Sequence, residues 1–336
     1  MKGLMKVQRV LSVVLLAGML LMPVVEALAQ DLPDFAAIIE TEDVMSHVRA
    51  LSVAIGARPM GSEAEQRAAE YVAAALDDWG YTVEIQTFET NSSGVAGAVT
   101  SRNVIATRPG DGAPVVVGAH LDSVDSGTGA GDNASGVAVM LAVAEALRDV
   151  ELVHPVVFVA FGAEEVGLVG SDVYVEQLGE EAGDILAMLN IDSVGVGTTL
   201  YVYAGAVVEG AVAVDGATAE FYFQGGPVWV RDLALDLAAE MNIPLSTTPD
   251  ETWGGFIGDW SDHYAFVEAS VPVAYFEAWW WDGAADPWWG QETPDGDVLH
   301  TEGDVYETVK PAQVEQAAEL VSATTFALAS GLAAPD

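Results

Sequence analysis

The spacing of hydrophobic and polar residues predicts a repeated order of strand, loop and helix along most of the chain. Short apolar runs predict buried strands, and apolar residues three or four positions apart predict helices that cover them. This alternation is typical of an α/β fold with a mixed, largely parallel, twisted central sheet flanked by helices on both faces. Strands are predicted at 81–88, 102–107, 114–118, 156–161 and 185–191, and helices at 134–147, 168–178 and 311–332.

The amino-terminal part of the predicted domain is helical in pattern. Residues 30–60 carry apolar positions at helical spacing, and a second helix begins at Ser62 and ends before Gly80. Ser62 and Glu65 have the spacing of a capping box, which marks a helix start. No linker divides the chain, so we predict a single domain over 30–336, with 198–299 as an irregular segment that forms the substrate pocket.

Residues 1–29 have the pattern of a secretory signal peptide. Lys2, Lys6 and Arg9 precede the apolar stretch 10–25, and Ala27-Leu28-Ala29 forms a small-residue cleavage pattern. The alternative is a retained membrane anchor, although the apolar stretch is short for a span. We therefore expect a secreted protein, extracellular or periplasmic, without stable membrane association after signal cleavage.

The charge balance restricts the classes of partner. The net charge is −40, and it becomes −42 without residues 1–29, which hold three of the 11 basic and one of the 51 acidic residues. So acidic a surface repels nucleic acid and anionic lipid, and we expect neither as a partner. The chain contains no cysteine, which excludes disulfides, thiolate ligands and a cysteine nucleophile. Histidine and carboxylate side chains must carry any chemistry.

Histidines and acids gather in four predicted loops at the carboxyl ends of strands or their equivalents. In an open α/β sheet those ends form the ligand crevice, so residues distant in sequence converge there. The spacing of His120 and Asp122 lets one group bind zinc while the other orients the imidazole ring from behind. The four loops supply, in order, His120, Asp122 and Asp132; Glu164 and Glu165; Asp192; and His300.

The number of candidate ligands favours two metal ions over one. Five oxygen or imidazole ligands are too many for one tetrahedral catalytic zinc, and they suit two zinc ions about 3.5–4 Å apart that share a bridging carboxylate. Of the adjacent residues Glu164 and Glu165, one can bind metal while the other accepts and donates a proton. Taken alone, the pair has the alternative interpretation of two solvated acids at a helix start.

As an ordered set, these motifs resemble the di-zinc aminopeptidases of the bacterial leucyl aminopeptidase type, which are related to glutaminyl cyclases and glutamate carboxypeptidases. The resemblance covers most of the chain, from Gly56-Ala57-Arg58-Pro59-Met60-Gly61-Ser62 through the final predicted helix. It implies that one zinc takes His120 and Asp192, that the other takes Glu165 and His300, and that Asp132 bridges them. It also implies that Glu164 is the general base and that Asp122 buttresses His120.

The activity implied by this resemblance is removal of amino-terminal residues from peptides by metal-activated water. One rival is a glutaminyl-cyclase-like enzyme, which would tolerate loss of part of the second ligand set. A carboxypeptidase would need a cation for the substrate carboxylate, and Arg58, Arg102 and Arg231 are the main candidates. A non-catalytic binding ectodomain is a rival of another class, and such a protein would lack ligands.

The sequence indicates the metal ligands more clearly than it indicates which residues contact the substrate. Leu299 stands where well-known relatives carry a tyrosine that helps to hold the oxyanion, and Tyr264 or Trp253 could replace it. Ser261-Asp262-His263 resembles a stretch that the family places near the site, although His263 could equally be a cap or core residue. The tryptophans at 279–281 and 288–289 predict a pocket for bulky apolar amino-terminal residues, with Trp280 as a substrate-binding residue, or a packing cluster.

Overall fold

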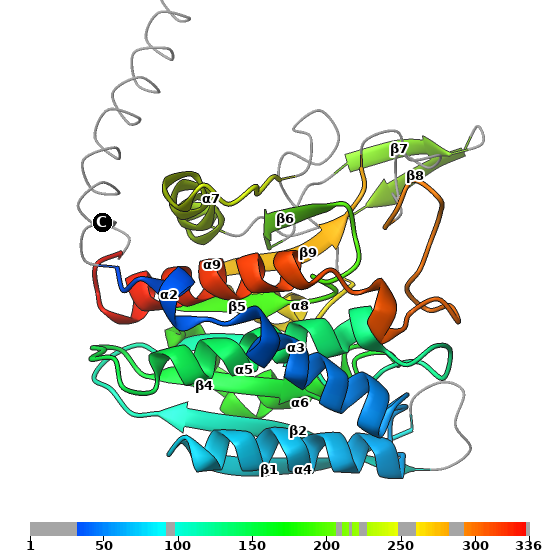
Figure 1. The fold of residues 1–336 in the computed structure, drawn as a ribbon, viewed down its shortest axis with the longest axis horizontal. Helices are drawn as coiled ribbons and strands as arrows, with labels where there is room; N and C mark the ends of the chain where they lie inside the picture. Colours follow the sequence, from blue (N-terminus) through cyan, green and yellow to red (C-terminus); the bar gives the residue numbers. More distant parts are fainter. Residues whose placement is uncertain are drawn as a thin grey trace, which may run out of the picture.

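A computed structural model describes residues 32–91, 98–205, 210–214, 217–221, 227–247, 260–281 and 292–333. Within these residues, a seven-stranded sheet in the order β1-β2-β4-β3-β5-β9-β6 forms the centre of the molecule (Figure 1). A separate antiparallel pair joins β7 (Gly210–Val214) to β8 (Ala217–Phe221). The strands of the main sheet are β1 (Thr82–Thr90), β2 (Val99–Arg108), β3 (Val115–His120), β4 (Val156–Phe161), β5 (Ala187–Ile191), β6 (Thr199–Ala204) and β9 (Val273–Trp279).

The four central strands of this sheet run parallel. Strand β3 pairs with β4 on one side and with β5 on the other, and β9 continues the parallel run beyond β5. At the edges, β2 is antiparallel to β4, β1 to β2, and β6 to β9. The predicted α/β fold with a mixed, largely parallel sheet is confirmed. The carboxyl ends of the parallel strands meet at one edge, where an open α/β sheet places its ligand crevice.

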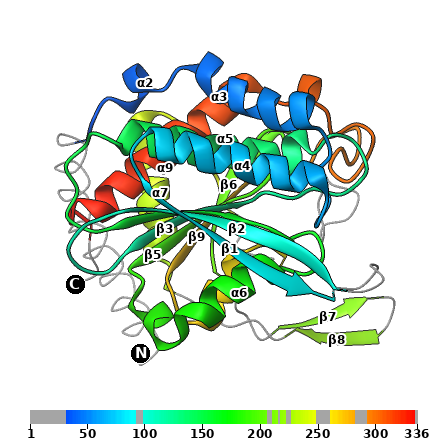
Figure 2. The same ribbon diagram turned by 90° about the horizontal axis from the view of Figure 1, so that it is seen from below.

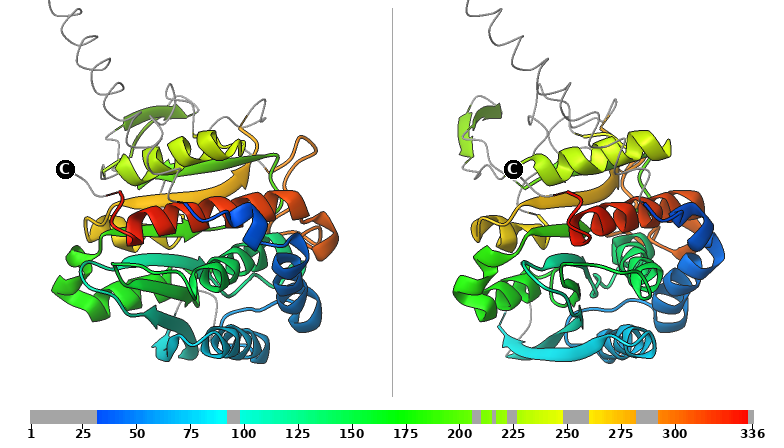
Figure 3. Two further views of the ribbon diagram at one scale, coloured as in Figure 1. Left: turned by 60° about the vertical axis from the view of Figure 1, so that its left-hand side comes forward. Right: turned by 90° about the vertical axis from the view of Figure 1, so that its left-hand side faces the viewer.

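Helices cover both faces of the sheet (Figure 2). In the side views of Figure 3, α9 (red) lies next to α7 (yellow-green) on the same face, and the two helices contact each other. The first face carries α2 (Phe35–Ile38), α3 (Thr41–Arg49), α4 (Glu63–Asp78), α5 (Gly136–Leu147), α7 (Trp229–Met241) and α9 (Pro311–Ala329), and the second carries α6 (Val169–Leu178) and α8 (His263–Glu268).

Strand β3 shows why the central strands are apolar without interruption. Val115 and Val117 belong to the core beneath α5 and α9, whereas Val116 belongs to the core on the α6 and α8 side. All three valines are fully buried. Because successive side chains alternate between two covered faces, neither face leaves room for a polar residue.

Two segments differ from the predicted pattern. The predicted helical stretch 30–60 is divided, because Ile39 and Glu40 are extended between α2 and α3, and a π-helical turn follows over Ala50–Ile55. This break lets Phe35 pack on Phe326 of α9 while α3 buries its own apolar side. The segment 198–299, expected to be irregular, supplies β6, α7, α8 and β9. The sheet pairs β9 with β5, which the local pattern alone did not reveal.

Helix α4 begins as predicted, with one difference in its cap. The Ser62 hydroxyl accepts the Glu65 backbone N–H at 3.1 Å. The Glu65 carboxylate instead accepts the Gly61 N–H and the Ser101 hydroxyl, so it ties the helix start to β2. No helix in the described ranges is long and apolar enough to cross a bilayer. The predicted signal peptide, residues 1–29, lies outside the described residues.

Candidate active site

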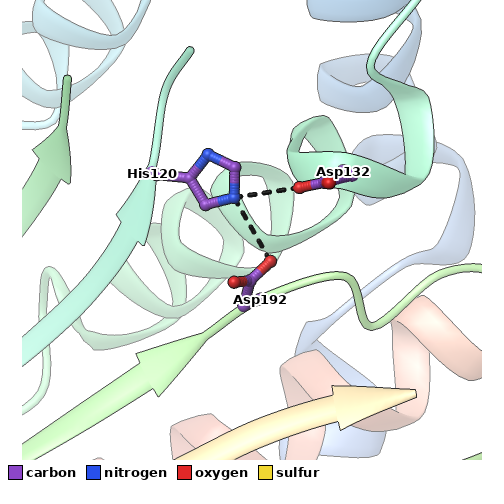
Figure 4. A group of neighbouring side chains, drawn as sticks. All are labelled: His120, Asp132 and Asp192. Carbon is purple, nitrogen blue, oxygen red and sulfur yellow. Dashed lines mark hydrogen bonds and ion pairs between the residues drawn. The ribbon is translucent and has the colours of Figure 1, made fainter. Parts of the chain in front are cut away.

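His120, the last residue of β3, meets two acids at the carboxyl edge of the sheet (Figure 4). Its Nε2 atom lies 3.0 Å from Asp132 Oδ1 and 3.2 Å from Asp192 Oδ1. Asp132 sits in the turn that leads into α5, and Asp192 directly follows β5. All three side chains are buried. Three elements thus bring three potential metal donors together.

A second donor set shares Asp132 with the first. His300 Nε2 lies 3.0 Å from Asp132 Oδ2 and 3.1 Å from Glu165 Oε2. The two oxygens of Asp132 therefore face different histidines, His120 through Oδ1 and His300 through Oδ2. A carboxylate in this position connects two adjacent donor sets, as a bridging ligand must.

Asp122 positions the two neighbouring glutamates. Its Oδ1 accepts the Glu164 N–H at 3.0 Å, and its Oδ2 accepts the Glu165 N–H at 3.3 Å. Ala163 has a left-handed backbone, with φ of 61°, which turns the chain after β4 so that both N–H groups face Asp122. The Nδ1 atom of His120 lies 3.8 Å from Asp122 Oδ1. Asp122 therefore sits behind the ring, as predicted, but too far away for a hydrogen bond.

Polar residues outside the predicted set hold the ligands in place. The Asn133 side chain donates to the Ile191 carbonyl at 2.9 Å and accepts the N–H groups of Gly136 and Ser193. It thereby joins the Asp132 turn to the end of β5. Its position next to Asp132 was the only signal in the sequence, since nothing in the local pattern shows that it reaches β5.

Two further supports act on Asp192 and Asp132. The Ser261 hydroxyl donates to Asp192 Oδ2 at 2.7 Å and accepts from the Asn190 side chain at 2.7 Å. The buried Asp304 carboxylate accepts the Gly131 N–H at 2.5 Å and the Asp132 N–H at 3.2 Å. Ser261 lies in the stretch Ser261-Asp262-His263 that the sequence singled out, and Asp304 follows the predicted ligand His300 by four positions, although the partners of both were not evident there.

Arg58 is a structural clamp on the loop that follows His120. Its guanidinium is fully buried and donates to the carbonyls of Leu121, Thr128 and Gly129, and also to those of Leu51 and Gly56. Burial lowers its pKa to about 10. Because its donors are engaged by these carbonyls, Arg58 is not placed to receive a substrate carboxylate.

We expect Arg58→Lys to destabilise the protein by about 3 kcal/mol, because an ammonium group cannot reproduce five carbonyl contacts in a buried site. Urea denaturation measures the loss. Arg67→Lys is the matched control, since Arg67 is exposed and makes a single 3.4 Å contact with the Ile55 carbonyl. Equal stability of the two variants would contradict the clamp.

The crowded acids have strongly shifted proton affinities. Burial raises the pKa of Glu164 well above its usual value, and it raises that of Asp122 to about 8. Burial acts in the same direction on Asp132, but hydrogen bonds from His120 and His300 outweigh it and lower the pKa. Hydrogen bonds to Asp132 and Glu165 raise the pKa of His300 to about 11. The site thus has a strong affinity for positive charge.

A cavity of about 440 Å³ opens above these groups. The described residues that line it include no lysine or arginine, although a substrate carboxylate would need one. The lining comprises His120, Asp132, Glu164, Glu165, Asp192, Ser193, Trp260, Tyr275, Glu277, Trp279, Glu292, Asp297, Leu299 and His300.

The predicted substrate-binding residues are not among these lining residues. His263 is fully buried and stacks on the Tyr275 ring, with 4.6 Å between ring centroids. Neither Tyr264 nor Trp280 lines the cavity, whereas the neighbouring Trp279 does. Leu299 lines it too, so this position offers no hydroxyl to the cavity. Trp253 and the tryptophans at 288–289 lie outside the described residues.

Glu277 is a cavity residue that the sequence analysis missed. Its two oxygens accept the hydroxyls of Tyr203 at 2.7 Å and Tyr275 at 2.8 Å. Burial raises its pKa to about 7, against the effect of these hydrogen bonds. Its only sequence signal was an acid within an otherwise apolar strand.

The donor chemistry fits metal ions. Imidazole nitrogens and carboxylate oxygens within 4.8 Å of one another form three groups: His120, Asp132 and Asp192; Asp132, Glu165 and His300; and His120, Glu164 and Glu165. Several buried carboxylates this close together repel one another unless cations neutralise them. Nitrogen and oxygen donors of this kind suit zinc and related divalent metals.

Comparison with known proteins agrees with this site. The sequence profile of peptidase family M28 matches residues 103–325, which span β2 through most of α9. The chain belongs to peptidase family M28. The matched region contains the metal-donor residues described above. The predicted resemblance to di-zinc aminopeptidases and glutaminyl cyclases is therefore confirmed at the level of the family.

Similar sequences include two bacterial enzymes. The chain is 34% identical over 243 residues to leupeptin-inactivating enzyme 1 of Streptomyces exfoliatus, covering 69% of this chain and 48% of that enzyme. It is 32% identical over 220 residues to aminopeptidase YwaD of Bacillus subtilis, covering 63% of this chain and 40% of that protein. The match thus spans about half or less of the length of these relatives.

Solved structures show the same fold. BSAP, a zinc aminopeptidase from Bacillus subtilis, superposes with a TM-score of 0.67 at 22% identity, over 85% of this chain and 94% of that one. A glutaminyl cyclase from Porphyromonas gingivalis superposes with a TM-score of 0.63 at 18% identity, over 86% and 97% of the two chains. Since both activities occur on this fold, the fold itself does not choose between them.

Proposed function

We propose that this M28 protein is a zinc-dependent aminopeptidase that uses two metal ions. The observation that carries the proposal is the position of Asp132, whose two oxygens face His120 and His300 separately. His120 and Asp192 would hold one ion, Glu165 and His300 the other, and Asp132 would bridge them. When bound, the ions would acidify water and polarise the substrate carbonyl.

Glu164 has the surroundings that a general base needs. Its backbone N–H is fixed by Asp122, its carboxylate lines the cavity, and burial raises its pKa. A raised pKa makes the carboxylate form a stronger base, which can take a proton from the attacking water and later deliver it to the leaving amine. Asp122 accepts the Glu164 N–H and lies behind the His120 ring, so we assign it a positioning role. In a buried site, charged and polar groups stabilise the negative charge that develops in the transition state more strongly than water does, which adds to the rate.

The charge of the cavity supports cleavage at the amino terminus. A free α-ammonium is attracted by the acidic lining, whereas a carboxypeptidase would need a cation for the substrate carboxylate. Arg58 is engaged by carbonyls, and neither Arg102 nor Arg231 lines the cavity. The sequence predicted a bulky apolar first residue. The apolar surface of Trp260, Trp279 and Leu299 supports a bulky side chain in contact with it, and the acids in the same lining also allow that side chain to carry a cation.

The cellular setting follows from the sequence. We propose that residues 1–29 direct secretion and are removed, and that residues 30–336 form the peptidase domain. Peptides with a free amino terminus would be the substrates, and the strongly acidic chain would not bind nucleic acid.

Hydrolysis of leucyl-p-nitroanilide beside its amino-acetylated analogue tests the activity, on protein reconstituted with zinc and assayed for bound metal. We expect cleavage of the free-amine compound alone, with about two zinc ions per chain. Equal cleavage of both compounds would contradict the aminopeptidase assignment. Cyclisation of an amino-terminal glutaminyl peptide without cleavage of either compound would identify the enzyme as a cyclase.

A further inference from the structure

The cavity contains a carboxylate, Glu277, that is neither a proposed metal ligand nor the proposed general base. Glu277 lies on β9, beside the end of β5 that carries Asp192, and the Asp192 N–H donates to the carbonyl of Phe276 at 2.9 Å. Glu277 is only 3% exposed, yet it lines the cavity. It is absent from the three groups of potential metal donors.

A chain of donors fixes this carboxylate. The Trp281 indole N–H donates to the Tyr203 hydroxyl at 2.9 Å, so the Tyr203 proton is directed to Glu277. Tyr275 donates to the second oxygen, and the Trp260 side chain forms a further hydrogen bond. Tyr203 and Tyr275 are both fully buried. Glu277 is therefore held in one orientation by neutral donors.

Glu277 has no basic partner in the described part of the chain. Burying a carboxylate is costly unless a cation or several donors compensate, and the donors here are two phenols and one indole. A carboxylate has about four lone-pair positions, so these donors leave room for a further partner. The cavity is where that partner can arrive, since Glu277 lines it together with Trp260, Tyr275 and Trp279.

We propose that Glu277 selects substrates whose amino-terminal residue has a long cationic side chain, lysine or arginine. The inference rests on the proposed aminopeptidase activity and names its substrate class. The α-ammonium stays beside the scissile carbonyl, in the acidic part of the cavity that holds the proposed metal ligands. The side chain extends farther into the cavity, where its methylene stem packs on Trp260 and Trp279 and its cation meets Glu277.

Lysyl- and norleucyl-p-nitroanilide test this assignment, because norleucine has the lysine side chain without its ammonium group. On zinc-loaded protein, we expect kcat/KM for the lysyl compound to exceed that for the norleucyl compound by about tenfold or more. Glu277→Gln should lower the lysyl value by about the same factor and leave the norleucyl value nearly unchanged. The control is Glu240→Gln, which makes the same change at an exposed residue of α7 that does not line the cavity, and it should preserve the ratio.

Each other outcome has a distinct meaning. If the wild-type protein cleaves the norleucyl compound as well as or better than the lysyl compound, the proposed selectivity is wrong while the aminopeptidase activity stands; this comparison needs no variant to fold. An equal loss for both compounds in Glu277→Gln would also overturn it, because Glu277 would then act on the shared part of the substrate. Cleavage of neither compound by zinc-loaded wild-type protein would refute the proposed function itself.

Discussion

Glu164→Gln is expected to lower kcat by about a hundredfold to ten-thousandfold, the usual contribution of a positioned general base. The amide keeps the size of the side chain but cannot take a proton from water. Because the proposed metal sites use other residues, the variant should retain the zinc content of the wild-type protein. Steady-state kinetics with leucyl-p-nitroanilide and metal analysis by mass spectrometry measure the two quantities.

The adjacent residue supplies a matched control. Glu165→Gln removes a donor that lies 3.1 Å from His300 Nε2, so it should lose about one zinc ion per chain together with activity. The geometry also groups Glu164 with His120 and Glu165 as potential metal donors. Loss of zinc from Glu164→Gln would therefore make Glu164 a ligand and remove it from the role of base.

Metal-free protein is expected to lose about 3 kcal/mol or more of folding stability between pH 5 and pH 8. Burial raises the pKa of Asp122 to about 8 and that of Asp262 and Glu277 to about 7. Above the ordinary carboxyl pKa near 4, the folded state then holds more protons than the unfolded state, so its stability falls as the pH rises. The raised pKa of His300 acts in the same direction.

Urea denaturation in a chelator at the two pH values measures this loss. Measurements in 1 M NaCl serve as a control, because salt screens repulsion between surface charges and leaves buried groups much less affected. Added zinc should restore stability at pH 8, since the metal binds the folded site. Metal-free protein that is as stable at pH 8 as at pH 5 would contradict the shifted proton affinities on which the expectation rests.

The correspondence between sequence and structure is closest where one local pattern suffices. The apolar run 114–118 predicts a buried strand, and β3 occupies Val115–His120, because both of its faces are covered. The helix start at Ser62 was also evident from its own residues. The division of 30–60 and the strand β9 were not evident, because each depends on packing against partners distant in the chain.

Residue type and position at strand ends determined which side chains could form a metal site, since His120, Glu164 and Asp192 each follow an apolar run. Tertiary structure alone decided which oxygen of Asp132 faces which histidine. It also decided that Arg58 clamps a loop instead of meeting substrate, and that Glu277 enters the cavity. The physical reason is that hydrogen bonds and burial join residues from separate strands, and no local spacing records which strands become neighbours.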